Sequence, residues 1–164
     1  MRRQMRRQKI PAVCPEPRGG DRIALYGSLM QGLGALEHLG VTSALHFEGS
    51  CSIPGQLFDL GSYPGLRPGP GCVRGELHRL DRQKGLSALA RLDEFEDFDP
   101  LRPEESLYRR VRVDLLEPAD CSAWLYVYNR QTDPRLQILS GDWRGYLGIG
   151  GRAGAPTDRE GHGR

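Results

Sequence analysis

Short segments in which apolar and polar residues alternate recur along this chain, and they restrict its fold more than any other feature. Val73, Gly75 and Leu77 alternate with polar or charged neighbours, which is typical of a strand with one buried face. Because such segments are frequent, much of the chain is predicted to form β-structure. The predicted strands cover residues 22–26, 45–52, 55–60, 73–77, 107–116 and 123–128.

Two segments have helical periodicity instead. The first has leucines at positions 33, 36 and 39 and stops at Gly40. The second has apolar residues at positions 86, 89, 90 and 92 or 95, with Asp81 as its predicted N-cap. Strands and helices do not alternate as they do in βαβ folds. The sequence therefore predicts an α+β fold with a mixed, mainly antiparallel sheet that can close into a small barrel.

The two ends of the chain differ from its middle in composition. Residues 1–20 combine charge with three prolines and a Gly19-Gly20 pair, and residues 150–164 carry almost no large apolar side chains. We therefore expect one domain at residues 21–149 between two disordered tails. Within this domain, seven glycines and prolines between positions 61 and 71 predict a loop.

The charge distribution argues against nucleic-acid and membrane partners. The formal net charge is only +2, and the basic excess is concentrated in the opening residues, MRRQMRRQK. No apolar run approaches the roughly 18 residues of a membrane span, and no apolar signal-peptide region follows the basic start. A cytoplasmic location is therefore expected. Four cysteines lie far apart without CxxC spacing, which predicts neither a disulfide nor a metal site.

The sequence contains no complete dinucleotide-binding or serine-nucleophile motif. Gly32-Leu33-Gly34 supplies G-x-G, but Glu37 occupies the place of the third glycine, so a dinucleotide site is not predicted. Ser28 is not part of G-x-S-x-G, and no histidine has the spacing of a catalytic base. Two features remain, a turn at residues 26–29 and an acidic run at residues 93–99. Taken alone, they fit an ordinary strand-to-helix connection and a solvated charged face.

Six short motifs nevertheless occur in the order and spacing of a known family. They are Tyr26-Gly27-Ser28-Leu29, Tyr63-Pro64-Gly65-Leu66, Val73-x-Gly75-Glu76-Leu77, Leu92-Asp93-x-Phe95-Glu96, Tyr108-x-Arg110 and Ala123-Trp124-x-Tyr126-Val127-Tyr128-Asn129. Over about residues 22–147 the chain resembles the γ-glutamylcyclotransferase-like superfamily. The closing Ser140-Gly141-Asp142-Trp143-Arg144-x-Tyr146-Leu147 is similar to its AIG2-like and γ-glutamylamine cyclotransferase branch. The resemblance implies a small mixed β-barrel with flanking helices, and an enzyme without cofactor or metal.

The resemblance also implies the site residues. The catalytic glutamate of the family maps onto Glu96, with Glu94 as the fallback, and the loop Tyr26-Gly27-Ser28-Leu29 is expected to receive the glutamyl end of a small-molecule substrate. Successive N–H groups of this loop suit an anion. Tyr128 is a further expected contact, on a strand face that either lines the cavity or packs in the core. Asp97 departs from the pattern, because a glycine often follows the catalytic glutamate.

The implied reaction converts a γ-glutamyl amine or amide into 5-oxoproline and a free amine. The substrate's own α-amine attacks its γ-carbonyl, so the site needs a base and no nucleophile. Partial burial of Glu96 would raise its pKa toward neutrality. Glutathione, γ-glutamyl dipeptides and isopeptides all stay open as substrates, and no residue pattern specifies an oligomeric state. The alternative is a non-catalytic binding or interaction module on the same fold.

Overall fold

The structure is a computed structural model that describes residues 16–148. The expected disordered tails, residues 1–20 and 150–164, fall mainly on residues 1–15 and 149–164, which lie outside the described residues. The described chain is tied to the domain from Gly20 onward, because its N–H donates to the carbonyl oxygen of Leu80 at 2.9 Å.

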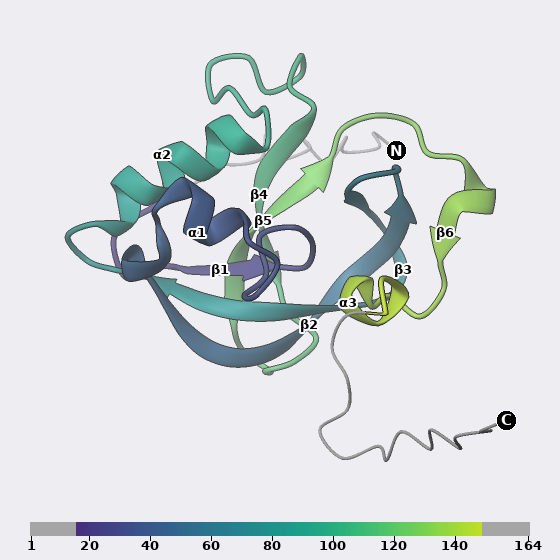
Figure 1. The fold of residues 1–164 in the computed structure, drawn as a ribbon, viewed down its shortest axis with the longest axis horizontal. Helices are drawn as coiled ribbons and strands as arrows, with labels where there is room; N and C mark the ends of the chain where they lie inside the picture. The colour runs from purple at the N-terminus through teal and green to yellow at the C-terminus, as the bar shows by residue number, and fades with distance from the viewer. Residues whose placement is uncertain (1–15, 149–164) are drawn as a thin grey trace, which may run out of the picture.

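The described residues form one six-stranded sheet with short helices around it (Figure 1). In chain order the elements are β1 (Arg22–Leu25), α1 (Ala35–Leu39), η1 (Thr42–Ala44), β2 (Leu45–Asp59), β3 (Pro64–Leu80), α2 (Gly85–Phe95), β4 (Tyr108–Asp114), β5 (Ser122–Tyr128), η2 (Pro134–Leu136), β6 (Gln137–Ile138) and α3 (Trp143–Tyr146), where η marks a 3-10 helix. The strand order is β4-β5-β1-β3-β2-β6. The β1–β5 pair is parallel, and the other pairs are antiparallel.

This topology confirms the predicted α+β fold with a mixed, mainly antiparallel sheet. The barrel is loose, because β4 and β6 form the two edges and the sheet does not close. Figure 1 shows β2 and β3 as a long curved ribbon, with α1 and α2 together on one side and α3 at a distance from them. A hydrogen bond of 3.1 Å from Arg91 Nη1 to the carbonyl oxygen of Leu39 joins α2 to the end of α1.

The predicted loop over residues 61–71 is wrong for most of its length, because β3 begins at Pro64. Proline is compatible with the first residue of a strand, and glycine with a bulge where two backbones approach closely. The β2–β3 register shifts between Pro54 and Gln56, and a Cβ on Gly71 would lie 2.8 Å from the carbonyl oxygen of Gly55. The glycines therefore allow a close strand crossing, and the two strands predicted at 45–52 and 55–60 form one strand, β2.

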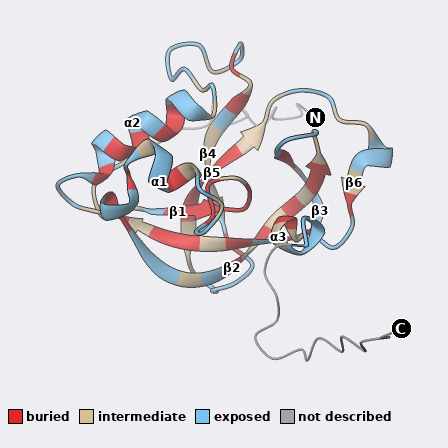
Figure 2. Ribbon diagram, viewed as in Figure 1, coloured by how far each residue is buried: buried red, intermediate tan, exposed pale blue. Residues whose placement is uncertain are grey.

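The core lies between the sheet and the helices. Figure 2 shows buried residues concentrated in β1, β3 and β5. Residues 123–126 of β5 are buried consecutively, so this strand next to the β4 edge is covered on both faces. The predicted second helix is present as α2, which buries Ala88, Leu89 and Leu92. Its predicted N-cap is wrong, because Lys84 occupies that position and the Asp81 carboxylate accepts from the N–H groups of Gln83 and Lys84 in the preceding turn.

Candidate active site

A cavity of about 370 Å³ lies where the end of β1, the start of β3, the end of α2 and the start of β4 meet. This volume suits a small molecule. Most of the lining side chains are apolar or aromatic, and Glu96 is the only carboxylate among them. The lining residues are Ala24, Leu25, Tyr26, Gly27, Ser28, Leu29, Ser62, Tyr63, Pro64, Phe95, Glu96, Leu107, Tyr108 and Tyr126.

The segment that follows β1 forms a tight turn on the cavity wall. The N–H of Met30 donates to the carbonyl oxygen of Gly27 at 3.0 Å, which places Ser28 and Leu29 at the centre of the turn. Within residues 16–148, the N–H groups of Gly27, Ser28 and Leu29 donate to no protein acceptor. The turn therefore lines the cavity with three residues whose backbone donors are free of protein acceptors, and a nest that binds an anion requires such donors.

Gly27 is required by a close contact across the cavity wall. A Cβ at this position would lie 2.6 Å from Pro64 Cγ, so any larger residue would push the turn and the start of β3 apart. Tyr26 also holds the start of β3 next to the end of β1. Its hydroxyl donates to the carbonyl oxygen of Tyr126 at 2.7 Å and accepts from the N–H of Leu66 at 3.2 Å. Tyr26 thus both lines the cavity and joins three strands of the sheet.

Glu96 is placed by the way α2 ends. It is the C-cap residue, and Asp97 follows in the left-handed region with φ 52°. The N–H of Phe98 donates to the carbonyl oxygen of Asp93 at 2.8 Å, and that of Asp97 donates to Glu94 at 3.1 Å. This pair of bonds defines a Schellman motif, which normally has glycine at the left-handed position. Asp97 therefore replaces the usual glycine and keeps its backbone conformation, because aspartate tolerates this region better than most residues.

The carboxyl of Glu96 has a strongly shifted pKa. The residue as a whole is partly exposed, but desolvation by the protein around its carboxyl raises its pKa to about 8. Burial also raises the pKa of Tyr26 and Tyr108, and the charge of the nearby Glu96 raises it further. These phenols therefore stay protonated and neutral at physiological pH.

The phenols around Glu96 direct their protons to other acceptors. The hydroxyl of Tyr108 donates to the carbonyl oxygen of Pro64 at 2.7 Å, and that of Tyr126 donates to Asp93 Oδ1 at 2.6 Å. Asp93 is also paired with Arg110 Nη1, so its charge is balanced inside the protein. Among the described residues, Glu96 receives no such partner, which explains why burial is not offset and its pKa rises.

Comparison with known proteins places the chain in a family. Residues 23–145 match the family described as "Gamma-glutamyl cyclotransferase, AIG2-like", and this range contains the whole cavity lining. The chain belongs to the AIG2-like γ-glutamylcyclotransferase family. One relative, the γ-glutamylcyclotransferase family protein YtfP of Escherichia coli strain K12, is 39% identical over 123 residues, which cover 74% of this chain and 95% of the relative.

Solved structures agree with this membership. The solution NMR structure of YtfP from Escherichia coli has a TM-score of 0.50 at 38% identity and covers 74% of this chain and 95% of that one. The crystal structure of an AIG2-like protein from Mus musculus has a TM-score of 0.54 at 25% identity and covers 84% of this chain and 100% of that one. The γ-glutamylcyclotransferase family thus shares the mixed α+β architecture of this chain.

The structure brings together most of the residues that the family resemblance implied. Tyr26, Gly27, Ser28, Leu29 and Glu96 all line the same cavity. The fallback residue behaves differently, because Glu94 is exposed and lies outside the cavity lining. Asp97 and Asp99 of the acidic run are also exposed, so a solvated face is the right interpretation for these three acids.

Tyr128 does not line this cavity. Its ring packs edge-on against Tyr108, with ring centroids 5.4 Å apart, and its Cβ lies close to the Gly65 backbone. The tyrosines that do line the cavity on this side are Tyr108 and Tyr126. Both belong to the motifs that carry the γ-glutamylcyclotransferase resemblance. Alternation along β5 places Tyr126 and Tyr128 on the same face, so it could not show which of the two lines the cavity.

The described residues offer few other candidate sites. Between residues 16 and 148, no three His, Cys, Asp or Glu side chains are grouped to hold a metal ion. Cys51, Cys72 and Cys121 are free thiols, and Cys14 lies outside this range. In the same part of the chain, no helix is long and apolar enough to cross a bilayer.

Proposed function

We propose that this protein cyclises the γ-glutamyl group of a γ-glutamyl amine or amide to 5-oxoproline and releases the free amine. The observation that carries this proposal is a carboxyl with a pKa of about 8 on the wall of a small, largely apolar cavity. The turn with unpartnered N–H groups lines the same cavity. Membership of the γ-glutamylcyclotransferase family supports the reaction class.

The proposed reaction exchanges one carbon–nitrogen bond for another within the substrate. The α-amine attacks the γ-carbonyl carbon, the five-membered lactam forms, and the bond to the leaving amine breaks. Glu96 takes a proton from the attacking amine and returns one to the leaving amine, so protons balance without a co-reactant. A snug cavity that holds the glutamyl chain folded back supplies the proximity advantage.

The raised pKa of Glu96 suits this double role. A carboxylate of ordinary pKa is a weak base toward an ammonium group, whereas one with a pKa of about 8 exchanges a proton with an amine at little free-energy difference. The neutral phenols of Tyr108 and Tyr126 add no competing charge beside it. Proton transfer in both directions is therefore feasible near neutral pH.

The turn at residues 27–29 supplies the complementary anion site. Its N–H groups would donate to the α-carboxylate of the substrate or to the oxyanion that develops on the γ-carbonyl. Tyr63, Phe95 and Leu107 form an apolar part of the lining, and Tyr63 and Phe95 are partly exposed there. We therefore expect γ-glutamyl amides with an apolar leaving amine to react faster than γ-glutamyl amino acids.

The test is release of 5-oxoproline by purified protein from a panel of γ-glutamyl amides. The panel should include γ-glutamylbutylamide, γ-glutamylglycine, glutathione and a γ-glutamyl isopeptide. We expect release from at least one member and loss of this release in Glu96→Gln. The matched control is Glu94→Gln, because Glu94 lies two residues away and is exposed. Binding of these amides without any release would instead favour the non-catalytic module.

A further inference from the structure

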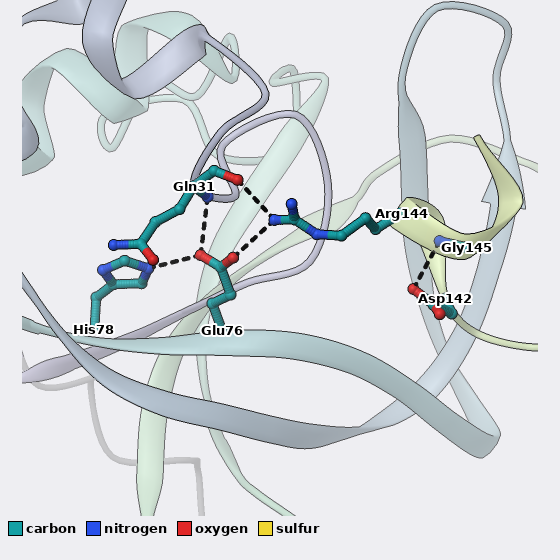
Figure 3. A network of polar contacts seen from close by, with 6 residues as sticks. All are labelled: Gln31, Glu76, His78, Asp142, Arg144 and Gly145. Carbon is teal, nitrogen blue, oxygen red and sulfur yellow. Dashed lines mark hydrogen bonds and ion pairs between the residues drawn. The ribbon is translucent and has the colours of Figure 1, made fainter. Parts of the chain in front are cut away.

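A second polar network lies next to the turn that lines the cavity, and it is centred on the backbone of Gln31 (Figure 3). The N–H of Gln31 donates to Glu76 Oε2 at 2.9 Å, and its carbonyl oxygen accepts from Arg144 Nη2 at 2.7 Å. Arg144 Nη2 also donates to Glu76 Oε1 at 2.9 Å. The side chains of Glu76 and Arg144 therefore hold the backbone N–H and C=O of Gln31 in a closed ring of hydrogen bonds.

Gln31 is the first residue after the turn that ends at Met30. Upstream, the turn is fixed by β1, whose last residue, Leu25, pairs directly with Glu76 of β3. Downstream, Gly32 and Gly34 adopt positive φ angles of 79° and 96° before α1 begins, and the N–H of Leu33 donates to the carbonyl oxygen of Met30 at 3.3 Å. The ring of hydrogen bonds at Gln31 thus ties the far end of the turn to β3 and α3, in addition to the buried side chains of Leu29 and Met30.

Glu76 and Arg144, the two side chains of the ring, are each fixed by further contacts. The Glu76 side chain is only 14% exposed, and His78 Nε2 lies 3.0 Å from its Oε2. Arg144 is carried by α3, which is anchored by the buried Trp143 and capped by Asp142, whose Oδ1 accepts from the N–H of Gly145 at 3.1 Å. The fold therefore brings Arg144 into contact with the loop at Gln31, which lies 113 positions earlier in the chain.

We propose that Glu76 and Arg144 are positioning residues that hold the Gly27–Leu29 turn in place, so that its N–H groups stay aimed at the cavity. Neither of the two lines that cavity, so they act through Gln31 and not on the substrate. This inference rests on the proposed function for its effect on turnover, but its effect on the turn can be measured without substrate.

The first experiment measures amide exchange by NMR in Arg144→Met. The N–H groups of Met30 and Gln31 report on the turn, since they donate to Gly27 and Glu76. We expect both to exchange at least about tenfold faster, while the amides of the β1–β3 ladder are unchanged. The matched control is Arg74→Met, because Arg74 is exposed and its Nη1 lies 3.9 Å from Oδ2 of its ion-pair partner, Asp142. Unchanged exchange at Met30 and Gln31 in Arg144→Met would overturn the proposal.

The second experiment measures turnover in the same variants. A turn that moves by about 1 Å is expected to lower kcat/KM by about 10- to 100-fold. The pH midpoint should stay where it is, because Glu96 is untouched, and Arg144→Lys should recover part of the rate by donating to the same oxygens. An unchanged rate in Arg144→Met would also count against the proposal. If the native protein releases no 5-oxoproline, the proposed function fails, and the exchange experiment still decides the role of Arg144.

Discussion

Glu96 combines a carboxyl group with an environment that disfavours its charge. Because burial raises its pKa to about 8, most of the carboxyl is protonated at pH 6 and most is ionised at pH 9. A base must be ionised in the free enzyme to accept a proton. We therefore predict that kcat/KM rises with pH through a midpoint near 8. A midpoint near 4.5, the ordinary value for glutamate, would contradict the burial of this group.

The same pKa shift predicts a pH-dependent stability. The folded state binds the Glu96 proton up to about pH 8, whereas the unfolded chain releases it near 4.5, so the native protein loses stability between these values as the pH rises. Glu96→Gln removes this loss. We expect the variant to be more stable than the native protein at pH 8 by about 1–3 kcal/mol, after allowance for partial exposure.

This stability prediction is checked by urea unfolding of both proteins at pH 5 and pH 8. The difference between them should shrink toward zero near pH 4.5, where Glu96 is increasingly protonated in both states. A gap of equal size at both pH values would show that the substitution acts through packing and not through the charge of Glu96.

Asp97 offers a separate prediction at the residue scale. Its φ of 52° is a conformation in which glycine is unstrained and a side chain is not. Asp97→Gly is expected to stabilise the protein by about 0.5–1 kcal/mol in thermal or urea unfolding. Asp97→Val should destabilise it, because a β-branched residue is least tolerant of this backbone. A destabilised glycine variant would imply that the Asp97 side chain makes a favourable contribution of its own.

The sequence predicted the residues of the site unevenly. The motif predicted Glu96, with Glu94 as the fallback, and only Glu96 lines the cavity. The sequence could not make this distinction, because it does not show which of the two side chains is buried. Tyr108 and Arg110 belonged to a quoted motif but had no assigned role. Their roles depend on the hydrogen bonds to Pro64 and Asp93, which join positions 44 and 17 residues apart. Spacing within one strand carries no information on such partners.

At the scale of elements, the contact between the turn after β1 and the start of β3 sets the shape of the cavity. A Cβ on Gly27 would lie 2.6 Å from Pro64 Cγ and 3.1 Å from its Cδ. Gly27→Ala is therefore expected to destabilise the protein by about 1–3 kcal/mol and to lower kcat/KM, because the turn must move.

A double-mutant cycle tests the origin of this effect. If the clash with the proline ring is responsible, Gly27→Ala combined with Pro64→Ala should lose less stability than the sum of the two single variants. The hydroxyl of Tyr108 donates to the backbone carbonyl oxygen of Pro64, so we expect this hydrogen bond to remain in both variants. Strict additivity would show that Gly27 and Pro64 act independently.

The strands were predicted well where apolar and polar residues alternate and poorly where glycine and proline dominate. Alternation with arginine identified β4 through Val111 and Val113, and the alternation of aliphatic and aromatic residues identified β5. The first part of β3 was missed, since Pro64 and the glycines near Gly71 are normally signals for a loop. Their role is visible only when β2 is placed opposite, because the close crossing with Gly55 requires residues without side chains.

For the whole molecule, the cavity is formed by segments that lie far apart in the sequence. The sheet has free edges at β4 and β6, and the cavity forms where β1, β3, β4 and α2 converge. Its lining extends from position 24 to position 126, so it is a product of the tertiary fold. Fold class was predictable from periodicity, whereas the convergence of these segments followed only from the family resemblance.

Amide cyclisation with Glu96 as acid and base is most directly tested by one rate comparison. Release of 5-oxoproline from the best γ-glutamyl amide of the panel should be measured for the native protein, Glu96→Gln and Glu94→Gln, each shown to be folded. We predict that Glu96→Gln lowers kcat by about 10²- to 10⁴-fold, while Glu94→Gln stays close to the native rate. Equal rates for native protein and Glu96→Gln would contradict the assignment of Glu96 as the acid and base.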